Sequence, residues 1–241
     1  MRSGSLSAVT NNIDTVLFDW GGTLATWHDI DLYAVWRSVA ELIDEARADE
    51  LAAKLVAAED AAWLRSRDEH VSTTLEAVCL AADVVLTPAA LAVYERQWHP
   101  HTELDPDAIG MLKELRHRGY RIGVLSNTIW SRQRHEEIFA RDAVLELIDG
   151  AVYTSEVPWT KPHPESFLAA MRAAGASDPA GCVFVGDRLF DDVWGAQNVG
   201  MRAVHIPHSN IPTHQVGHTE GAPDATIQRL SELPGVLDSW K

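Results

Sequence analysis

Short apolar runs recur along this 241-residue chain, and between them lie stretches in which apolar residues return every three or four positions. Short runs rich in Val, Ile, Leu and Phe are typical of buried strands, and the longer spacing is typical of helices that bury one face. The predicted strands cover residues 15–18, 121–125, 151–154, 183–185 and 203–206. Because strands that alternate with helices form parallel sheets with right-handed crossovers, the pattern predicts an α/β fold with a doubly wound parallel sheet.

One helical stretch is far longer than a connection between two strands requires. Helical patterns fill residues 27–102, whereas a parallel crossover takes about a dozen residues. We therefore expect an all-helical cap domain at 27–102, inserted into a Rossmann-like core made of 14–26 and 103–241. Residues 1–13 are expected to form a flexible N-terminal segment, and a short helix over 227–233 is expected to close the core.

Charge and cysteine content narrow the classes of function. The formal net charge is −15, and nucleic-acid binding rests on clustered basic residues, so we expect no nucleic-acid partner. The two cysteines, Cys79 and Cys182, are expected to be buried and free. Since no apolar run reaches the roughly 18 residues of a membrane helix and no signal-peptide core follows Met1, we expect a cytoplasmic protein with no membrane partner.

Residues suited to phosphoryl chemistry follow four of the predicted strands: Asp19, Ser126, Lys161 and Asp187, in chain order. The carboxyl ends of parallel strands meet at one edge of a sheet, where ligands bind. Two carboxylates at that edge can hold Mg²⁺, which prefers hard oxygen ligands. A lysine and a hydroxyl can receive phosphoryl oxygens while a carboxylate attacks phosphorus.

The motifs around these residues resemble those of the haloacid dehalogenase-like hydrolase superfamily, in the subgroup with a helical cap between the first and second motifs. They are Asp19-Trp20-Gly21-Gly22-Thr23, Ser126-Asn127, Lys161-Pro162, and Gly186-Asp187 with Asp192 five residues later. The resemblance covers about residues 14–237. It implies a phosphatase that acts on a small phosphorylated metabolite through an aspartyl phosphate, with Mg²⁺ as its cofactor.

The resemblance also implies a role for each motif residue. Asp19 is the expected nucleophile, and Ser126 and Lys161 complete the expected catalytic set. Substrate contacts are expected from Ser126, Asn127, Gly22 and Thr23. The expected metal ligands are Asp19, the carbonyl oxygen of Gly21, Asp187 and Asp192. Because the family allows two spacings for the last carboxylate, Asp191 is the alternative to Asp192, and either could instead cap a helix.

Gly21 departs from the pattern, because phosphatases of this family usually carry there an Asp that serves as general acid and base. The carbonyl oxygen is kept, but a proton donor worth about 10² to 10⁴ in rate is missing. One explanation is a phosphatase whose leaving group needs little protonation, or one that takes the proton from His28, Asp29 or Asp31.

Two further explanations of Gly21 stay open. One is an enzyme that resembles phosphonoacetaldehyde hydrolases and cleaves a C–P bond, which requires a cap lysine for a Schiff base; Lys54 is the only lysine in the expected cap. The other is a binding or regulatory protein without turnover. A true dehalogenase is disfavoured, because such enzymes work without Mg²⁺ and the acidic motif from Asp187 to Asp192 is intact here.

Aromatic, arginine and histidine residues give weaker signals. Trp20, Trp27 and Trp130 are candidates for the lining of an apolar substrate pocket. Arg188 could meet an anionic substrate or form a surface salt bridge. Three histidines, His208, His214 and His218, lie in a loop without an accompanying cysteine or carboxylate cluster, which disfavours a zinc site.

Overall fold

A parallel six-stranded sheet forms the centre of the computed structural model, which describes residues 13–27, 29–208 and 217–241. Its strands run in the order β3-β2-β1-β4-β5-β6. They are β1 (Thr15–Phe18), β2 (Arg121–Ser126), β3 (Gly150–Tyr153), β4 (Cys182–Gly186), β5 (Arg202–His205) and β6 (Ala225–Thr226). All neighbouring strands are parallel. From β1, the strands β2 and β3 extend the sheet to one side, and β4, β5 and β6 extend it to the other side. The predicted doubly wound fold is therefore confirmed.

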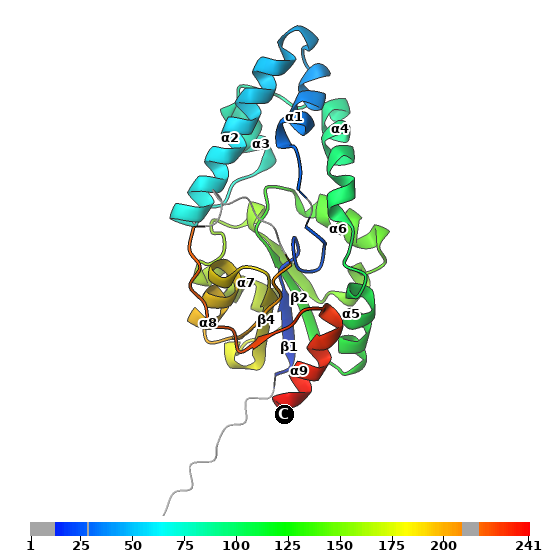
Figure 1. The fold of residues 1–241 in the computed structure, drawn as a ribbon, viewed down its shortest axis with the longest axis vertical. Helices are drawn as coiled ribbons and strands as arrows, with labels where there is room; N and C mark the ends of the chain where they lie inside the picture. The colour runs from blue at the N-terminus through cyan, green and yellow to red at the C-terminus, as the bar shows by residue number, and fades with distance from the viewer. Residues whose placement is uncertain (1–12, 28, 209–216) are drawn as a thin grey trace, which may run out of the picture.

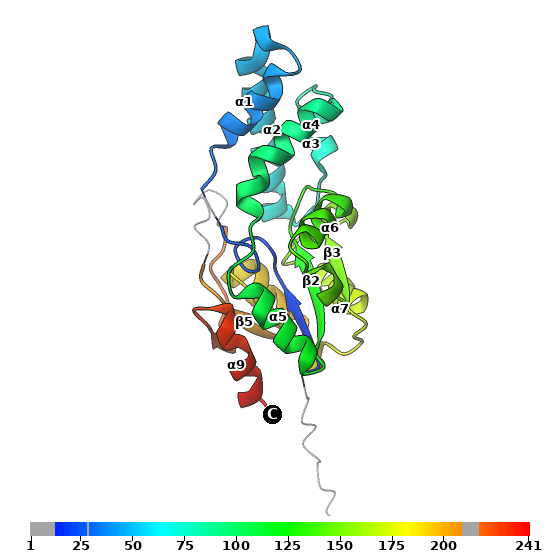
Figure 2. The ribbon, with the colours of Figure 1, turned by 90° about the vertical axis from the view of Figure 1, so that its right-hand side faces the viewer.

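Alternation along the buried strands explains why helices cover both faces of this sheet. In β1, Val16 and Phe18 belong to one apolar cluster, whereas Leu17 between them belongs to another on the opposite face. The first cluster includes α5 (Ala108–His117), α6 (Arg132–Arg141) and α9 (Leu233–Ser239), and the second includes α7 (Pro164–Ala173) and α8 (Gly195–Asn198). Figure 2 shows α5 against the sheet from the side.

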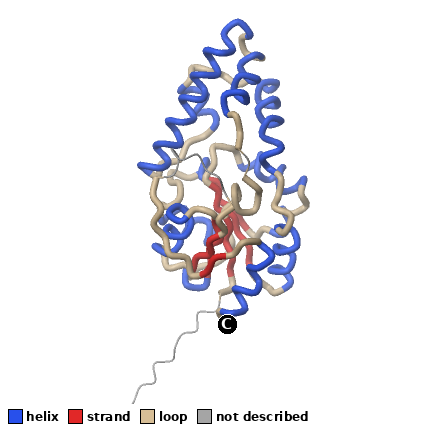
Figure 3. The backbone as a smooth tube through the Cα atoms, in the orientation of Figure 1, coloured by secondary structure: helices blue, strands red, loops and turns tan. Residues whose placement is uncertain are grey.

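Four helices lie beyond the carboxyl ends of the strands, in the upper half of Figures 1 and 3. They are α1 (Leu32–Glu41), α2 (Ala48–Glu69), α3 (Leu75–Ala81) and α4 (Pro88–Trp98), and we call them the cap helices. Threonines fix two of their starts: Thr74 Oγ1 accepts a hydrogen bond from the backbone N of Ala77 at 3.2 Å, and Thr87 Oγ1 accepts one from that of Ala90 at 3.2 Å. The cap helices thus form where the sequence pattern predicts an insertion.

Short 3₁₀ turns join several of these elements, at Glu45–Arg47, His99–Thr102, Leu145–Leu147, Thr154–Glu156, Pro179–Gly181 and Leu230–Glu232. Both cysteines are buried and free, as predicted. In the part of the chain that is described, no helix is long and apolar enough to cross a membrane. Most of the segment expected to be flexible, residues 1–12, lies outside the described residues.

The predicted closing helix is present, but it lies later in the chain than residues 227–233: a 3₁₀ turn covers Leu230–Glu232 and α9 follows it. Ala225 and Thr226 pair with Val204 and His205 to add β6 at the edge of the sheet, and α9 begins only at Leu233. Pro234 sits at the start of α9, a position where the missing N–H costs nothing.

Candidate active site

The first motif forms a tight turn that presents Asp19 at the carboxyl edge of the sheet. The backbone N of Asp19 donates to the carbonyl of Val185 at 2.9 Å, which extends the β1–β4 ladder by one residue and fixes Asp19 beside β4. Gly22 has a φ of 91°, a conformation that L residues with a Cβ rarely adopt, and its N donates to the carbonyl of Ala25 at 2.8 Å. The glycine therefore allows the chain to turn directly after Asp19.

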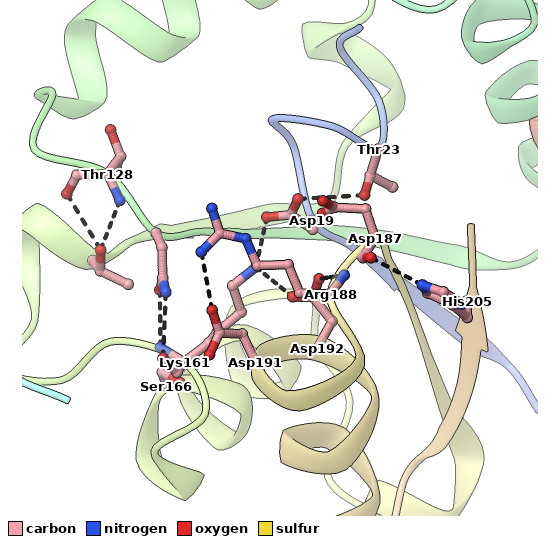
Figure 4. A network of polar contacts seen from close by, with 12 residues as sticks. Asp19, Thr23, Thr128, Lys161, Ser166, Asp187, Arg188, Asp191, Asp192 and His205 are labelled. Carbon is pink, nitrogen blue, oxygen red and sulfur yellow. Dashed lines mark hydrogen bonds and ion pairs between the residues drawn. The ribbon is translucent and has the colours of Figure 1, made fainter. Parts of the chain in front are cut away.

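Two side chains hold the Asp19 carboxylate. Lys161 Nζ donates to Asp19 Oδ1 at 2.5 Å, and Thr23 Oγ1 lies 3.3 Å from Asp19 Oδ2 (Figure 4). Lys161 is buried and also donates to Asp192 Oδ1 at 2.6 Å. Burial opposes the charge of Lys161, but Asp19 and Asp192 outweigh it and hold its pKa above the ordinary value. The ammonium is therefore permanently charged at neutral pH.

Asp187 and Asp192 reach the same edge from β4 and the turn that follows it. A π-helical turn, Leu189–Trp194, carries Asp192 back over the end of the strand, where its Oδ2 accepts from the backbone N of Arg188 at 2.9 Å. Gly186 permits this approach, because a Cβ there would lie 2.4 Å from the Asp192 carboxylate. The backbone carbonyl of Asp187 is 2.9 Å from His205 Nε2 on β5.

Asp19, Asp187 and Asp192 form a buried carboxylate cluster that suits a metal ion. Each offers one oxygen, and these atoms all lie within 4.8 Å of one another. Burial raises the pKa of Asp192; Lys161 opposes this shift and Asp19 adds to it. Packing three carboxylates together is costly without compensating positive charge, and Lys161 supplies part of it. Hard oxygen donors around a region of excess negative charge fit Mg²⁺.

Asp191 points away from this cluster and pairs with Arg188, whose Nη1 donates to Asp191 Oδ2 at 3.1 Å (Figure 4). Burial disfavours the charge of Arg188, but Asp191, Asp187 and further carboxylates raise its pKa above the ordinary value. The geometry thus favours Asp192 over Asp191 as the last acidic member of the cluster. Arg188 lines the cavity described below, so its salt bridge is a site contact rather than a surface one.

Ser126 and Asn127 lie where β2 ends, and both line the cavity. The Ser126 side chain is buried. The side chain of Asn127 is committed to the backbone of Lys161: Asn127 Oδ1 accepts from Lys161 N at 2.9 Å, and Nδ2 donates to Lys161 O at 3.3 Å. Asn127 therefore positions the lysine, a role that the sequence motif alone did not indicate.

Gly22 and Thr23, which are predicted to contact substrate, do not line the cavity. Both are buried, and among the described residues the cavity is lined by Gly21 but not by these two. Gly22 makes the turn and Thr23 holds Asp19, so the two residues orient the expected nucleophile instead of facing the substrate space.

A cavity of about 360 Å³ opens from Asp19 into the cap helices. Six of its 20 lining residues are aromatic: Trp20, Trp27, Trp63, Tyr94, Trp98 and Trp130. The predicted pocket residues Trp20, Trp27 and Trp130 are all among them. Tyr94 and Trp98 come from α4, and the indole N–H of Trp130, on the core side, donates to Tyr94 Oη at 3.0 Å.

A carboxyl group in the cap, Glu59, also lines this cavity and was missed in the sequence. The available signal was its spacing, since Leu55, Glu59 and Ala62 lie on the buried stripe of α2. A charged residue at a core position of an alanine-rich helix is uncommon unless it has partners. The neighbouring Asp60 lines the cavity as well.

None of the described candidates for the missing acid lies in the cavity wall. Asp29 and Asp31 are exposed, and Asp31 caps α1 by accepting from Ala34 N at 3.0 Å; His28 lies outside the described residues. Gly21 itself leaves room, because a Cβ at that position would meet no atom within 4 Å. The structure therefore provides space for a side chain at Gly21 but no replacement acid beside it among the described candidates.

Two other predicted side chains lie apart from the site. Lys54 is exposed on α2 and pairs with Glu50 at 2.7 Å, and it does not line the cavity. His208 contacts the carbonyl of Gln228, and His218 pairs with Glu220; His214 lies outside the described residues. Among the described residues, the acidic group that could hold a metal ion is Asp19, Asp187 and Asp192.

Comparison with known proteins agrees with this geometry. A family model described as a haloacid dehalogenase-like hydrolase matches residues 13–200. The chain belongs to the haloacid dehalogenase-like hydrolase family. The four motifs that carried the resemblance lie within the matched residues, and so do all the cap helices.

Relatives within this hydrolase family include several phosphatases. The glyceraldehyde 3-phosphate phosphatase of Methanopyrus kandleri is 28% identical over 168 residues, 70% of this chain and 71% of that protein. The phosphoserine phosphatase of Thermus thermophilus is 33% identical over 142 residues, 58% of this chain and 52% of that protein. A solved structure of a HAD phosphatase from Thermococcus onnurineus has a TM-score of 0.65 and 25% identity, and covers 93% of this chain and 98% of that one. The relatives are named for different substrates.

Proposed function

We propose that this hydrolase is a Mg²⁺-dependent phosphatase that acts on a small phosphorylated molecule through an aspartyl phosphate on Asp19. The observation that carries the proposal is the cluster of Asp19, Asp187 and Asp192 around Lys161, at the sheet edge where the cavity opens. The phosphatases among its relatives support the reaction class.

In the first step an Asp19 oxygen attacks phosphorus, and the P–O bond to the leaving group breaks with its electrons staying on the leaving oxygen. Lys161, held by Asn127 and Asp192, fixes the Asp19 carboxylate and balances charge on the phosphoryl oxygens. Ser126, which lines the cavity at the end of β2, would donate to one of those oxygens. In the second step water attacks phosphorus, releases inorganic phosphate and restores Asp19.

Asp19, Asp187 and Asp192, with the carbonyl oxygen of Gly21, would hold Mg²⁺. When bound, Mg²⁺ supplies positive charge that neutralises the phosphoryl oxygens. The carboxylates themselves have a second task, because Asp192 also anchors Lys161. Removal of Asp192 would therefore disturb both the metal site and the orientation of the lysine.

Gly21 limits the leaving groups that this site can release quickly. Without an acid beside the leaving oxygen, the leaving group departs as an anion that takes its proton from solvent. Aryl and acyl phosphates, whose leaving groups are stable anions, need this proton least. We therefore propose a preference for such substrates over alkyl phosphates.

We further propose that residues 27–102 act as a cap domain that closes over the substrate. The cap helices supply Trp63, Tyr94 and Trp98 to the cavity, while the core supplies Asp19 and Lys161. Neither alternative function has similar support: Lys54 lies outside the cavity wall, and an intact cluster around Lys161 is not needed for binding alone.

The test is phosphate release from a panel of aryl, acyl and alkyl phosphates, with Mg²⁺ and with EDTA. We expect release that requires Mg²⁺ and that falls by at least about 10³-fold in Asp19→Asn, which keeps the shape but not the nucleophile. The matched control is Asp29→Asn, an exposed position that should keep wild-type rates. Wild-type activity in Asp19→Asn, or no release from any phosphate, would contradict the proposal.

A further inference from the structure

The aromatic part of the cavity is held in a fixed arrangement. Trp98 and Trp130 meet edge to face with ring centroids 5.2 Å apart, and Trp20 and Trp130 do so at 5.9 Å. The hydrogen bond from Trp130 to Tyr94 locks the rings of the core against those of the cap. Such walls suit a flat apolar body more than a short polar chain.

Glu59 is the carboxylate at the cap end of this cavity. It lies near the middle of α2, ten residues and therefore roughly 15 Å along the helix from its core-side end at Glu69. Its side chain is buried at 3% exposure. Trp36 Nε1 donates to Glu59 Oε2 at 2.7 Å, and Trp63 Nε1 donates to Oε1 at 3.4 Å. A carboxylate accepts about four hydrogen bonds, so acceptor capacity is left over.

No described Lys, Arg or His pairs with Glu59, since its contacts are these indoles. Burial raises the pKa of Glu59 from 4.5 to about 7, against the two indole hydrogen bonds, and Asp60 adds to the shift. A structural acceptor for two N–H groups does not need a charge, because a neutral amide would serve at a lower cost of burial. The carboxylate is therefore better explained by a ligand than by the indoles alone.

Charge and shape at this end favour a cation. Glu59 and Asp60 both line the cavity, and the neighbouring indole and phenol faces attract positive charge. At the other end, Asp19 and Lys161 would hold the phosphoryl group, and Gly21 favours an aryl leaving group. In an aryl phosphate with an ammonium group, the phosphoryl group would lie at Asp19 and Lys161, the ring against the aromatic residues, and the ammonium at Glu59.

We propose that the cavity takes an aryl phosphate that carries a primary ammonium at the end away from phosphorus, and that Glu59 receives this ammonium. This substrate class rests on the proposed phosphatase function of the Asp19 site. The aromatic ring lies against the aromatic wall that Trp98 and Trp130 form together, and Glu59 acts as the residue that selects the cationic substrate over a neutral one of the same size.

The experiment compares two substrates of matched shape, para-(aminoethyl)phenyl phosphate and its neutral isostere para-propylphenyl phosphate. In the wild-type protein we expect kcat/KM to favour the amine by at least about tenfold, since hydrogen bonds to charged groups are worth about 1.5–3 kcal/mol. In Glu59→Gln the preference should fall below about threefold, mainly through loss of kcat/KM on the amine. Glu50→Gln, an exposed position on the same helix, is the matched control and should keep the preference.

Equal rates on the two substrates, or a preference that persists in Glu59→Gln, would overturn the assignment of Glu59. A second readout does not depend on turnover. Tryptophan fluorescence would measure how tightly the Asp19→Asn variant binds the free amine para-(aminoethyl)phenol and the neutral para-propylphenol. Tighter binding of the amine, lost when Glu59→Gln is added, supports the subsite even if no phosphate is released. Absence of phosphate release alone would count against the phosphatase proposal and not against this one.

Discussion

The core end and the cap end of the cavity are built from different chemistry. At the core end, three buried aspartates lie close together and a lysine donates to two of them, on backbone that the sheet holds in place. At the cap end, aromatic rings from helices enclose a single buried glutamate between two indole N–H groups. The first arrangement suits a reaction on a phosphoryl group, and the second suits recognition of what is attached to it.

This difference separates two kinds of substitution. Changes at the core end should alter rate on every substrate, because each substrate presents the same phosphoryl group there. Changes at the cap end should alter the choice among substrates or the stability of the cap. The predictions below test this separation, beginning with the largest expected effect.

After loss of Asp19, Lys161→Met should have the largest effect, and the property that it lowers is the stability of the folded protein. It leaves Asp19 and Asp192 buried without their shared cation, a loss of about 3–5 kcal/mol in the free energy of unfolding. Thermal melting would measure it, and Mg²⁺ should restore part of the loss by neutralising the carboxylates. Lys54→Met is the control, because an exposed salt bridge to Glu50 contributes about 1 kcal/mol or less. Equal destabilisation by both substitutions would refute the central role given to Lys161.

Gly21→Asp should raise activity on alkyl phosphates by up to about 10²-fold while changing aryl phosphates by less than about threefold. The reason is that only the poorer leaving group needs a proton, and the position has room for a side chain. Steady-state kcat/KM on matched alkyl and aryl phosphates would measure the difference. Gly21→Asn has the same shape without the acid and should give no gain. If both substrate classes gain equally, an acid is already supplied elsewhere.

Glu59→Gln should change how stability depends on pH. Because the pKa of Glu59 is raised to about 7, the folded protein binds more protons than the unfolded chain between pH 4.5 and about 7. The stability that protonated Glu59 contributes is thus fully present below pH 4.5 and lost as pH rises to about 7. The glutamine variant, which cannot ionise, should be more stable than wild type at pH 8 by at most about 3 kcal/mol, with no advantage at pH 4.

Urea unfolding at several pH values would measure this difference between the two proteins. Two groups that interact with Glu59 do not titrate in that interval, because burial raises the pKa of Cys79 to about 12 and holds that of Tyr94 well above its ordinary value. A stability difference that stays constant between pH 4 and 8 would show that Glu59 does not carry the raised pKa.

The sequence predicted the sheet well, because the strands that form its centre are buried on both faces and must be apolar throughout. All five predicted strands are present, and the motif residues after them come together as parallel topology requires. The edge was predicted poorly. Ala225 and Thr226 form β6 by pairing with the unpaired backbone groups at the edge of β5. The local sequence around residues 225–226 does not indicate this pairing.

The site residues show the same contrast between what the sequence predicted and what only the structure showed. Asp19, Ser126, Lys161 and Asp187 were identifiable in the chain, because a strand end fixes where the next residue lies. The choice between Asp191 and Asp192 was decided by a π-helical turn, whose extra residue per turn rotates one carboxylate toward Lys161 and leaves the other with Arg188. The commitment of Asn127 to the backbone of Lys161, across 34 positions, was likewise visible only in three dimensions.

The sequence by itself determined the fold class and the family, and it indicated the residues that we propose to react, because these depend on backbone periodicity and on side chains placed at strand ends. The tertiary structure alone decided the cavity, with Glu59 on α2 facing a space that also reaches Asp19. A helix pattern shows which residues are buried, but not which other elements enclose them. The packing of the cap helices against the core determines which elements enclose these residues. It therefore also determines the cavity, to which we assign substrate selection.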